Sequence, residues 1–519
     1  MPRIYLRYLF LSLVSGICIA ILSGCSAEAK LASGVEIYET GEYHRAIEKF
    51  DKMDFDNRYY RARASYYLGL SYYKTGQGQR AAAYLQRAVR YGLTEPVVHF
   101  YIGQSLRMRE EYEEAIEAYE NYLDHDVGNR AALNGIRSCR MAMNDPEETR
   151  YEVEMVRSLR SRESDYAPDF AGDDYTMVYF SSMRGGDKKR TTNQITGQGS
   201  SVIYRSIQDG RGGWEDPEPF IGNEELQHDD GTPSFSGDGK EMYFTRCPFP
   251  EGDDNTGATI MVRERSAGQW SEPEEVSLGP DSLVYAHPAI SPDGETLVFV
   301  SDMPGGQGGK DLWKATRLRG NEWGEPENLG PDINTPADEM FPAFRSDGRL
   351  YFSSDGLIGY GGLDIFEASF EEEEEEWDVR NMGLPVNSPA HDFGITFRGN
   401  RNIGFLSSSR NSYRGVDDIY EFELPVIQAV LRGRVTDESG NPIEDARVRV
   451  VGDNGTNMTA SSSENGRFNF VLEPGANYTV MASAPGYYNG RASLSTHDME
   501  ESQEFEESVV LQETKTEDE

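Results

Sequence analysis

The chain has 519 residues, with 50 Lys and Arg against 89 Asp and Glu, which gives a formal net charge of −39. This length corresponds to three or four domains of about 150 residues each. Hydrophobic residues make up 37% of the sequence, which excludes an acidic disordered polymer. The charge argues against a nucleic-acid partner, because phosphates repel an acidic surface. The sequence contains a single long apolar stretch, at the N-terminus, which excludes a multi-pass membrane protein.

Residues 1–24 have the composition of a signal peptide. Arg3 and Arg7 precede an apolar run that is too short to span a membrane. The run ends in a motif that resembles the bacterial lipobox: Leu22, Ser23, Gly24 and Cys25. The resemblance implies cleavage before Cys25 and acylation of that residue, so that lipid anchors the chain. The serine after Cys25 favours the outer membrane; the alternative is an ordinary signal peptide with a chance cysteine.

Residues 25–145 are expected to form helical repeats. Three glycines are spaced 35 and 34 residues apart, and a large apolar residue follows each of them by 16 positions. The pairs are Gly34 with Phe50, Gly69 with Leu85 and Gly103 with Tyr119. This spacing resembles that of tetratricopeptide (TPR) repeats, in which small residues lie where two helices cross. Residues 129–143 are expected to form a closing helix.

The TPR resemblance implies a concave groove that holds a peptide of a partner protein. In this register six polar and aromatic side chains are expected to line the groove. They are Arg63, Tyr66, Tyr73, Lys74, Gln104 and Arg107. The alternative is that the tyrosines pack between helices.

Five similar segments occupy residues 164–424, after a polar linker at 146–163. Each segment has two strands joined by a tight turn and continues into a further strand. Equivalent positions in the five segments are Pro168, Pro233, Pro288, Pro342 and Gly394. The repeat predicts a β-propeller of about five blades, or six if the termini combine into another blade. The segments resemble the WD40-like PD repeats of bacterial periplasmic proteins.

Residues 427–512 alternate apolar and polar side chains, as in Val448 with Val450 and Phe468 with Phe470. This pattern predicts a β-sandwich and resembles the carboxypeptidase regulatory-like domain. Residues 513–519 are expected to form a disordered acidic tail. The predicted fold class is therefore multidomain α + β, with an N-terminal TPR α-solenoid, a β-propeller and a C-terminal β-sandwich.

Acidic residues and histidines recur at the start of the innermost propeller strands. These residues are His228, Asp229, Asp230, His287, Asp338, Glu339, His391 and Asp392. Such positions converge on one end of a propeller channel, where polar side chains commonly cap turns and hydrogen-bond to neighbouring blades. A divalent cation or a basic peptide bound there is the alternative. The sequence contains no G-x-S-x-G, H-E-x-x-H, P-loop or C-x-x-C motif, so no catalytic residue, metal or cofactor is predicted apart from the lipid on Cys25.

The order of the modules resembles that of outer-membrane lipoproteins linked to type IX secretion and gliding motility. The resemblance implies a non-enzymatic scaffold that faces the periplasm and binds other proteins of an outer-membrane complex. Those relatives usually end in an OmpA-like domain that holds peptidoglycan. The residues after 512 resemble no such domain, so peptidoglycan binding by this chain is not expected. Two alternatives are a glycan- or peptide-binding lipoprotein for nutrient capture and a propeller hydrolase or lyase.

Overall fold

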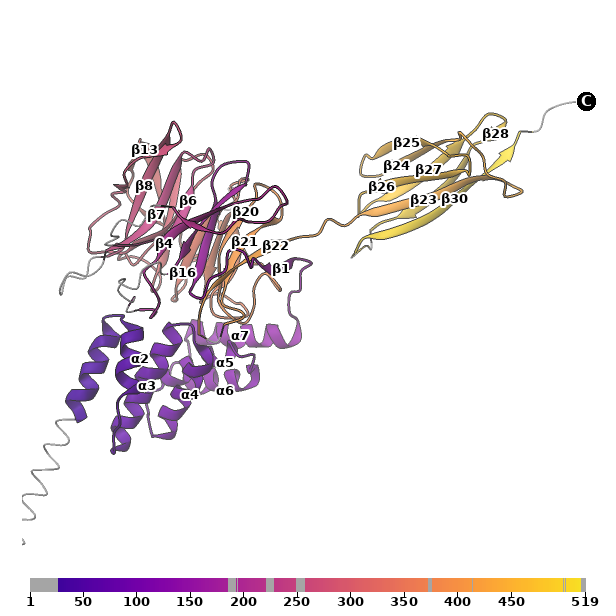
Figure 1. Cartoon of the computed structure of the whole chain (residues 1–519). Coiled ribbons are helices and arrows are strands. Elements are labelled where there is room, and N and C mark those ends of the chain that lie inside the picture. The colour runs from indigo at the N-terminus through magenta and orange to yellow at the C-terminus, as the bar shows by residue number, and fades with distance from the viewer. Residues whose placement is uncertain are drawn as a thin grey trace, which may run out of the picture. The chain divides into compact units, whose positions relative to one another are not determined.

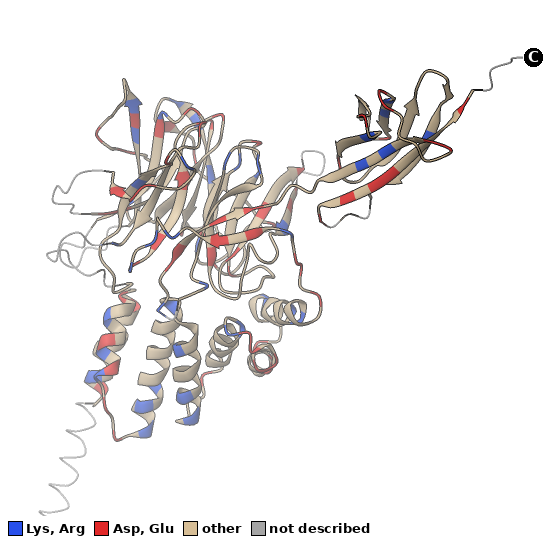
Figure 2. Ribbon diagram, turned by 45° about the vertical axis from the view of Figure 1, so that its right-hand side comes forward, with Lys and Arg blue, Asp and Glu red and all other residues tan. Residues whose placement is uncertain are grey.

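The computed structural model describes residues 27–184, 193, 195–220, 228–248, 257–371, 376–412, 414–497, 499 and 501–514. The chain divides into two compact units, Met1–Leu424 and Pro425–Glu519. Acidic and basic residues are scattered over the helices and sheets of both units (Figure 2). Within the described ranges no helix is both long enough and apolar enough to span a membrane. The predicted lipobox and Cys25 lie outside the described residues.

The first unit begins with a stack of helices (Figure 1). Residues 27–39 are helical. The helices that follow are α2 (Tyr43–Asp51), α3 (Arg58–Lys74), α4 (Gly78–Arg90), α5 (Val97–Arg107), α6 (Tyr112–Leu123) and α7 (Arg130–Asn144). The side chains of Asn57 and Asn129 cap α3 and α7 by accepting backbone N–H bonds, which starts these helices at the observed residues. Helix α7 packs on α6, as expected for a closing helix.

The 16-residue spacing of the glycines corresponds to close helix crossings. A Cβ atom added to any of the three glycines would lie 2.6 or 2.7 Å from a side-chain atom of its large partner. The pairs are Gly34 with Phe50, Gly69 with Leu85 and Gly103 with Tyr119. Each glycine is therefore required by the packing of the repeat, and the TPR prediction is confirmed in its detailed register.

Five antiparallel sheets form the propeller, each running from an inner to an outer strand. The first blade is β2 (Asp165–Phe170), β3 (Met177–Ser182), β4 (Val202–Ile207) and β5 (Glu218–Pro219). The second is β6 (His228–Phe235), β7 (Glu241–Pro248), β8 (Thr259–Ser266) and β10 (Glu274–Glu275), with β9 (Gln269–Trp270) also paired to β8. The third is β11 (Tyr285–Ile290), β12 (Thr296–Ser301), β13 (Asp311–Arg319) and β14 (Glu322–Trp323), with β15 (Glu327–Asn328) also paired to β13. The fourth is β16 (Glu339–Phe344), β17 (Leu350–Ser354), β18 (Asp364–Glu371) and β19 (Glu376–Asn381). The fifth is β20 (Asp392–Phe397), β21 (Ile403–Ser408), β22 (Asp418–Glu423) and β1 (Glu152–Met155).

The inner strands contact one another in a closed ring, because β2 touches both β6 and β20. Strand β1 pairs antiparallel with β22 and places Val153 opposite Phe422. The segment 146–163, which was expected to be a linker, therefore supplies the outer strand of the fifth blade. The termini of the propeller complete this blade, and the described residues form no sixth blade. Strand β1 has four residues whose side chains alternate between exposed and half-buried positions, so its sequence shows little of the apolar alternation by which strands are predicted.

Every inner strand contains a β-bulge with one residue in the left-handed region, at φ between 48° and 58°. These residues are Ala167, Thr232, His287, Phe341 and Gly394. Gly394 therefore corresponds to the residue before each proline, and the predicted equivalence of Gly394 with the prolines was wrong by one position. A positive φ is strained for most side chains but not for glycine. The presence of Gly394 at this position of the fifth blade, where the other blades have larger residues, is therefore explained by its backbone conformation.

The propeller core consists of five apolar clusters, one between each pair of neighbouring blades. Phe170 of the first blade stacks on Phe405 of the fifth, with ring centroids 5.2 Å apart. Tyr179 of the first blade packs on Phe235 of the second at 4.8 Å. The buried side chains thus stabilise the ring by joining blades as well as by filling each sheet.

The second unit is a sandwich of two four-stranded sheets. One contains β26 (Arg467–Leu472), β23 (Ala429–Asp437), β30 (Gln503–Glu513) and β28 (Tyr487–Tyr488). The other contains β25 (Asn457–Ser461), β24 (Arg447–Gly452), β27 (Asn477–Ser483) and β29 (Gly490–Ser495). The predicted inward positions are buried in one core, including Val448, Val450, Phe468 and Phe470.

Candidate functional site

The helical repeats and the propeller share a buried interface within the first unit. On α7, the Asn134 side chain donates a 2.9 Å hydrogen bond to the carbonyl oxygen of Gly356. One turn further, the Ser138 hydroxyl oxygen accepts a 3.1 Å bond from the Gly359 amide. Both side chains are buried, and both hold the loop between β17 and β18. The helices therefore lie against one end of the propeller (Figure 1).

Three of the predicted groove residues lie at this interface. Arg107 is 2% exposed; burial acts to lower its pKa, but Tyr119 and Asp364 outweigh burial and raise it. Desolvation raises the pKa of Tyr73 well above its ordinary value, and the Asp355 charge adds to the shift. Desolvation acts to lower the pKa of Lys74, but the combined effects of Asp338, Tyr101, Tyr43 and Asp355 outweigh it, and the net shift is upward. The propeller thus faces this half of the predicted groove.

The propeller residue His391 meets the helices from the other side. A Cβ atom on Gly76, just beyond the end of α3, would lie 3.5 Å from the His391 ring. Burial lowers the pKa of His391 to about 4, and its Nδ1 accepts a 3.1 Å bond from the Leu363 amide. The groove and the propeller mouth, which the sequence predicts as two separate binding sites, are therefore partly in contact with each other.

The mouth carboxylates are bonded mainly within their own blades. The partners are Arg246 for Asp230; Thr335 and Ser354 for Glu339; Ser388, Ser408 and Arg410 for Asp392; Asn193 and Ser201 for Asp229; and Lys310 for Asp338. His228 is half-buried at the start of β6. Within the described ranges, no three His, Cys, Asp or Glu side chains are placed to hold a metal ion. The mouth carboxylates thus accept hydrogen bonds from nearby backbone amides, hydroxyls and arginines, which is the arrangement that the sequence favoured over a bound cation.

His287 lies inside the channel and not at the mouth. Its ring stacks on Phe341 with centroids 4.0 Å apart, and its Nδ1 accepts a 3.3 Å bond from the Phe341 amide. Burial lowers the pKa of His287 to about 3, so the ring is neutral. At three other blade junctions the backbone amide of the bulge residue donates to a hydroxyl oxygen of the neighbouring blade. The bonds run from Ala167 to Ser407, from Thr232 to Ser181 and from His287 to Thr245. The His287 ring therefore replaces a structural hydroxyl.

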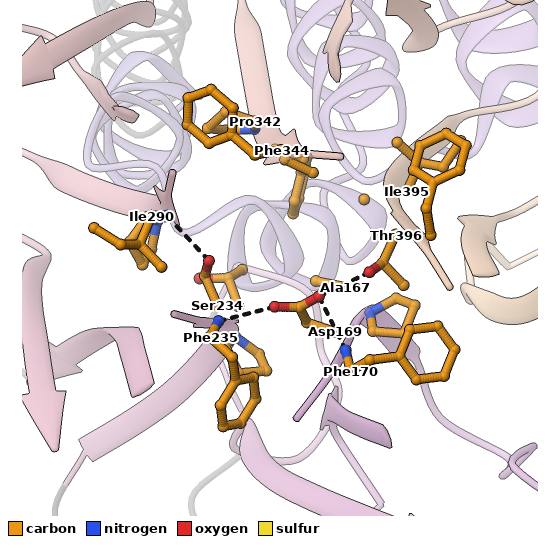
Figure 3. Close-up of a pocket in the computed structure, with 18 of the residues that line it drawn as sticks. Ala167, Asp169, Phe170, Ser234, Phe235, Ile290, Pro342, Phe344, Ile395 and Thr396 are labelled. Atoms are coloured by element: carbon orange, nitrogen blue, oxygen red, sulfur yellow. Dashed lines mark hydrogen bonds between the residues drawn. The ribbon is translucent and has the colours of Figure 1, made fainter. Parts of the chain in front are cut away.

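The channel holds a cavity of about 110 Å³, which is room for several water molecules (Figure 3). Asp169, which the sequence analysis did not single out, projects into it. Its carboxylate accepts bonds from the Phe170 amide, the Phe235 amide and the Thr396 hydroxyl at 2.9, 2.9 and 2.7 Å. Burial raises the pKa of Asp169 to about 6. Asp169 therefore joins three blades. Among the described residues that line this cavity it is the one carboxylate, whereas glycoside hydrolysis uses a pair of carboxylates.

The other half of the groove carries a cluster of half-buried tyrosines, called here the tyrosine surface. Its members are Tyr38, Tyr43, Tyr66, Tyr67 and Tyr101. The ring of Tyr38 lies 5.5 Å from that of Tyr43 and 5.3 Å from that of Tyr67. Burial raises the pKa of Tyr38 above its ordinary value, with further contributions from Tyr101 and the other members of the surface. These rings present apolar faces and hydroxyl groups together.

Of two further predicted groove residues, Arg63 borders the tyrosine surface and Gln104 lies beneath it. The Arg63 guanidinium pairs with Glu95 at 2.5 Å. Gln104 is buried: it donates a 3.4 Å bond to the Tyr73 hydroxyl and accepts one from Tyr119. Of the predicted groove residues, Tyr66 therefore belongs to the tyrosine surface, and Gln104 packs between helices. The sequence signal that marks most of the remaining surface is the tyrosine content of the first helix in each repeat, which supplies Tyr38, Tyr67 and Tyr101, whereas Tyr43 begins α2.

Family models match two parts of the chain. A tetratricopeptide repeat model matches residues 38–96 and 66–132, and a carboxypeptidase regulatory-like domain model matches residues 430–512. None of the curated proteins compared with the sequence matches it. The repeats imply a scaffold that takes part in protein–protein interactions.

Solved structures resemble parts of the chain. A MamA protein is 26% identical, with a TM-score of 0.21, over 22% of this chain and 63% of that one. A TolB structure from Agrobacterium tumefaciens is 12% identical, with a TM-score of 0.31, over 62% of this chain and 96% of that one. A 3-chlorocatechol 1,2-dioxygenase from Rhodococcus opacus 1CP is 12% identical, with a TM-score of 0.15, over 17% of this chain. The chain spans 62% of the length of that dioxygenase.

Proposed function

We propose that this chain is a non-enzymatic scaffold that binds other proteins through the tyrosine surface. In this proposal, lipid on Cys25 anchors it to the periplasmic face of the outer membrane. The assembly that it serves is one for secretion or motility, as the order of its modules implies. No cofactor or peptidoglycan contact is part of the proposal.

The observation that carries the proposal is the division of the TPR groove. The propeller lies against the half that contains Tyr73 and Arg107, whereas the tyrosine surface stays partly exposed. Tyrosine rings combine a large apolar area with a hydroxyl group, and such residues contribute strongly to protein interfaces. Because the propeller shortens the groove, the expected occupant is a short segment of a partner and not a long helix.

The state of the acidic residues supports a non-enzymatic role. Asp230 and Asp392 form ion pairs with arginines, at 2.7 and 2.5 Å. Asp169 is occupied by three hydrogen bonds that join blades. A general acid or base must reach its substrate, and these carboxylates are committed to the protein itself.

Partner capture tests the binding role of the tyrosine surface. Cross-linking in cells, followed by purification and mass spectrometry, is compared for the unmodified chain, Tyr66→Ala and the control Tyr91→Ala. Tyr91 is also half-buried but lies at the end of α4 beside Arg87, outside the tyrosine surface. We expect secretion or motility proteins to be lost with Tyr66→Ala and kept with Tyr91→Ala. Equal capture by both variants, or capture of polysaccharide-uptake proteins alone, contradicts the proposal.

Membrane attachment is tested separately with Cys25→Ala. Without the acylated thiol the chain is expected to move from the membrane fraction to the soluble periplasmic fraction. A Cys18→Ala variant is the control, because Cys18 leaves with the signal peptide in this proposal. If Cys25→Ala stays in the membrane fraction, the anchor is assigned to the wrong residue.

A further inference from the structure

A groove runs between the third and fourth blades, far in sequence from the tyrosine surface. It is called here the blade 3–4 groove and has a cavity volume of about 710 Å³. The lining residues used below are Asp293, Lys314, Glu327 and Asp332 from the third-blade side and Asp347, Phe370 and Trp377 from the fourth. Its size suits an extended segment of several residues.

The fourth-blade wall carries a pair of aromatic rings. Phe370 and Trp377 are cross-strand partners on β18 and β19, with ring centroids 5.2 Å apart and an angle of 62° between the planes. Trp377 is half-buried against the core of the blade, whereas Phe370 is 50% exposed. A half-exposed phenylalanine beside a tryptophan in a groove forms a surface on which a further group can stack.

The groove has a strong excess of negative charge. Four carboxylates line it against one ammonium group: Asp293, Glu327, Asp332 and Asp347 against Lys314. Lys314 pairs with Glu327 at 3.4 Å, and Asp347 pairs with Arg345 and Arg349 at 3.6 and 3.5 Å. Among the described residues, Asp293 and Asp332 are the two lining carboxylates that have no ion pair. The Asp332 carboxylate accepts a 3.5 Å bond from the backbone amide of Trp377, so it lies beside the strand that carries one of the two rings.

We propose that the blade 3–4 groove docks an extended segment of a partner protein through a lysine or arginine side chain. The cation lies against the rings of Phe370 and Trp377 and is neutralised by Asp332. A cation over an aromatic face is attracted by the ring, and a neighbouring carboxylate strengthens its binding. The net charge of −39 attracts a basic segment over a longer range. The inference rests on the proposed function only in that the chain binds proteins; the site and its chemistry are new.

Fluorescence anisotropy with a labelled probe peptide tests the site on the full chain. The probe is Gly-Leu-Arg-Pro-Arg-Leu-Gly, and the control probe replaces both arginines with citrulline, which is nearly isosteric but uncharged. We expect the arginine probe to bind more tightly than the citrulline probe, with an affinity that falls as salt rises. Phe370→Ala and Asp332→Asn are each expected to weaken it by about two- to fivefold.

Matched variants separate the groove from the general charge of the protein. Asp378→Asn removes the same charge from β19 outside the groove lining, where Asp378 pairs with Arg380 at 2.5 Å. Leu318→Ala removes an apolar side chain that is 68% exposed and is not part of the lining. Both control variants are expected to bind the arginine probe as the unmodified chain does. Thermal unfolding of each variant shows that the fold is retained.

Any one of several results would overturn the proposal. They are a lack of saturable binding at low salt, equal binding of the citrulline probe, an equal loss with Asp378→Asn and Asp332→Asn, and binding of cellohexaose in place of the peptide. Tyr66→Ala is expected to leave probe affinity unchanged. If Tyr66→Ala abolishes probe binding, the peptide occupies the tyrosine surface, and the groove proposal fails while the proposed function stands. Conversely, if partner capture fails while the probe still binds, the proposed function is contradicted and the groove proposal is kept.

Discussion

Asn134 on α7 donates a hydrogen bond of 2.9 Å to the carbonyl oxygen of Gly356, which follows it by 222 residues. The amide is 8% exposed, and its acceptor belongs to a loop of the fourth blade. This bond, with the one from Gly359 to Ser138, joins the helical repeats to the propeller. The two modules are therefore expected to unfold together and not as independent domains.

Asn134→Ala is expected to destabilise the first unit by about 1–3 kcal/mol, because it leaves the Gly356 carbonyl without this donor. Equilibrium unfolding in urea measures the change. Asn144→Ala is the matched control, since Asn144 is exposed and, among the described residues, its side chain bonds to the Arg140 carbonyl within its own helix. A loss for Asn134→Ala no larger than that of the control shows that the interface contributes little to stability.

Gly103→Ala is expected to destabilise the helical repeats by about 1–3 kcal/mol through overpacking. The added Cβ would lie 2.7 Å from the buried ring of Tyr119, and this clash outweighs the better helix propensity of alanine, about 1 kcal/mol. Gly128→Ala has no atom within 4 Å of its added Cβ and serves as the control. Helical circular dichroism on heating compares the two. A stabilised Gly103→Ala variant contradicts the close crossing.

The pairing of β1 with β22 makes a prediction about where the propeller begins. A propeller fragment that starts at residue 164 lacks β1, whereas one that starts at residue 146 retains it. The shorter fragment is expected to be less stable by on the order of 3 kcal/mol, because it loses the partial burial of Val153 and Met155 on β1 and the complete burial of Leu159, which alone contributes about 1.5–3 kcal/mol. Thermal unfolding and gel filtration compare the fragments. Equal stability and equal monomer content show that β1 is dispensable.

The buried carboxylates predict that the first unit is more stable in mild acid. Burial raises the pKa of Asp364 to about 7, although Arg107 opposes the shift. Burial likewise raises the pKa of Glu339 to about 7. At these two sites the folded state binds more protons than the unfolded chain between about pH 4 and pH 7, which decreases the free energy of unfolding as the pH rises through this window. The lowered pKa values of His287 and His391 act in the opposite direction, but burial also raises the pKa values of Asp169, Asp355 and Asp417, so the carboxylates dominate. The unfolding temperature is expected to be higher near pH 5 than near pH 8.

Asp364→Asn tests the origin of this pH dependence. It removes one titrating group and is expected to make the unfolding temperature depend less on pH. Asp238→Asn is the control, because a hydrogen bond with Lys240 lowers the pKa of Asp238, which places its effect at lower pH. If the two variants show the same profile as the unmodified chain, the pH dependence does not come from Asp364.

Repeat spacing alone identified most of the fold. The 16-residue interval from Gly103 to Tyr119 and the alternation of Phe468 with Phe470 are local patterns, and each reflects a contact within one repeat or one strand. Strand β1 was missed because its partner β22 lies about 270 residues away in sequence. The register error at Gly394 arose because a bulge shifts the alignment by one residue, and only the backbone angle shows this.

The candidate site depended more heavily on long-range contacts. The sequence by itself determined three modules, an acidic surface and a supply of tyrosines and carboxylates, since these follow from composition and short-range spacing. Only the tertiary structure decided which of these groups remain available to a partner. Arg107 and Asp364 lie in different modules, yet each shifts the pKa of the other at the interface. The exposure of a side chain depends on what packs against it, and in this chain the helices and the propeller cover each other's predicted sites.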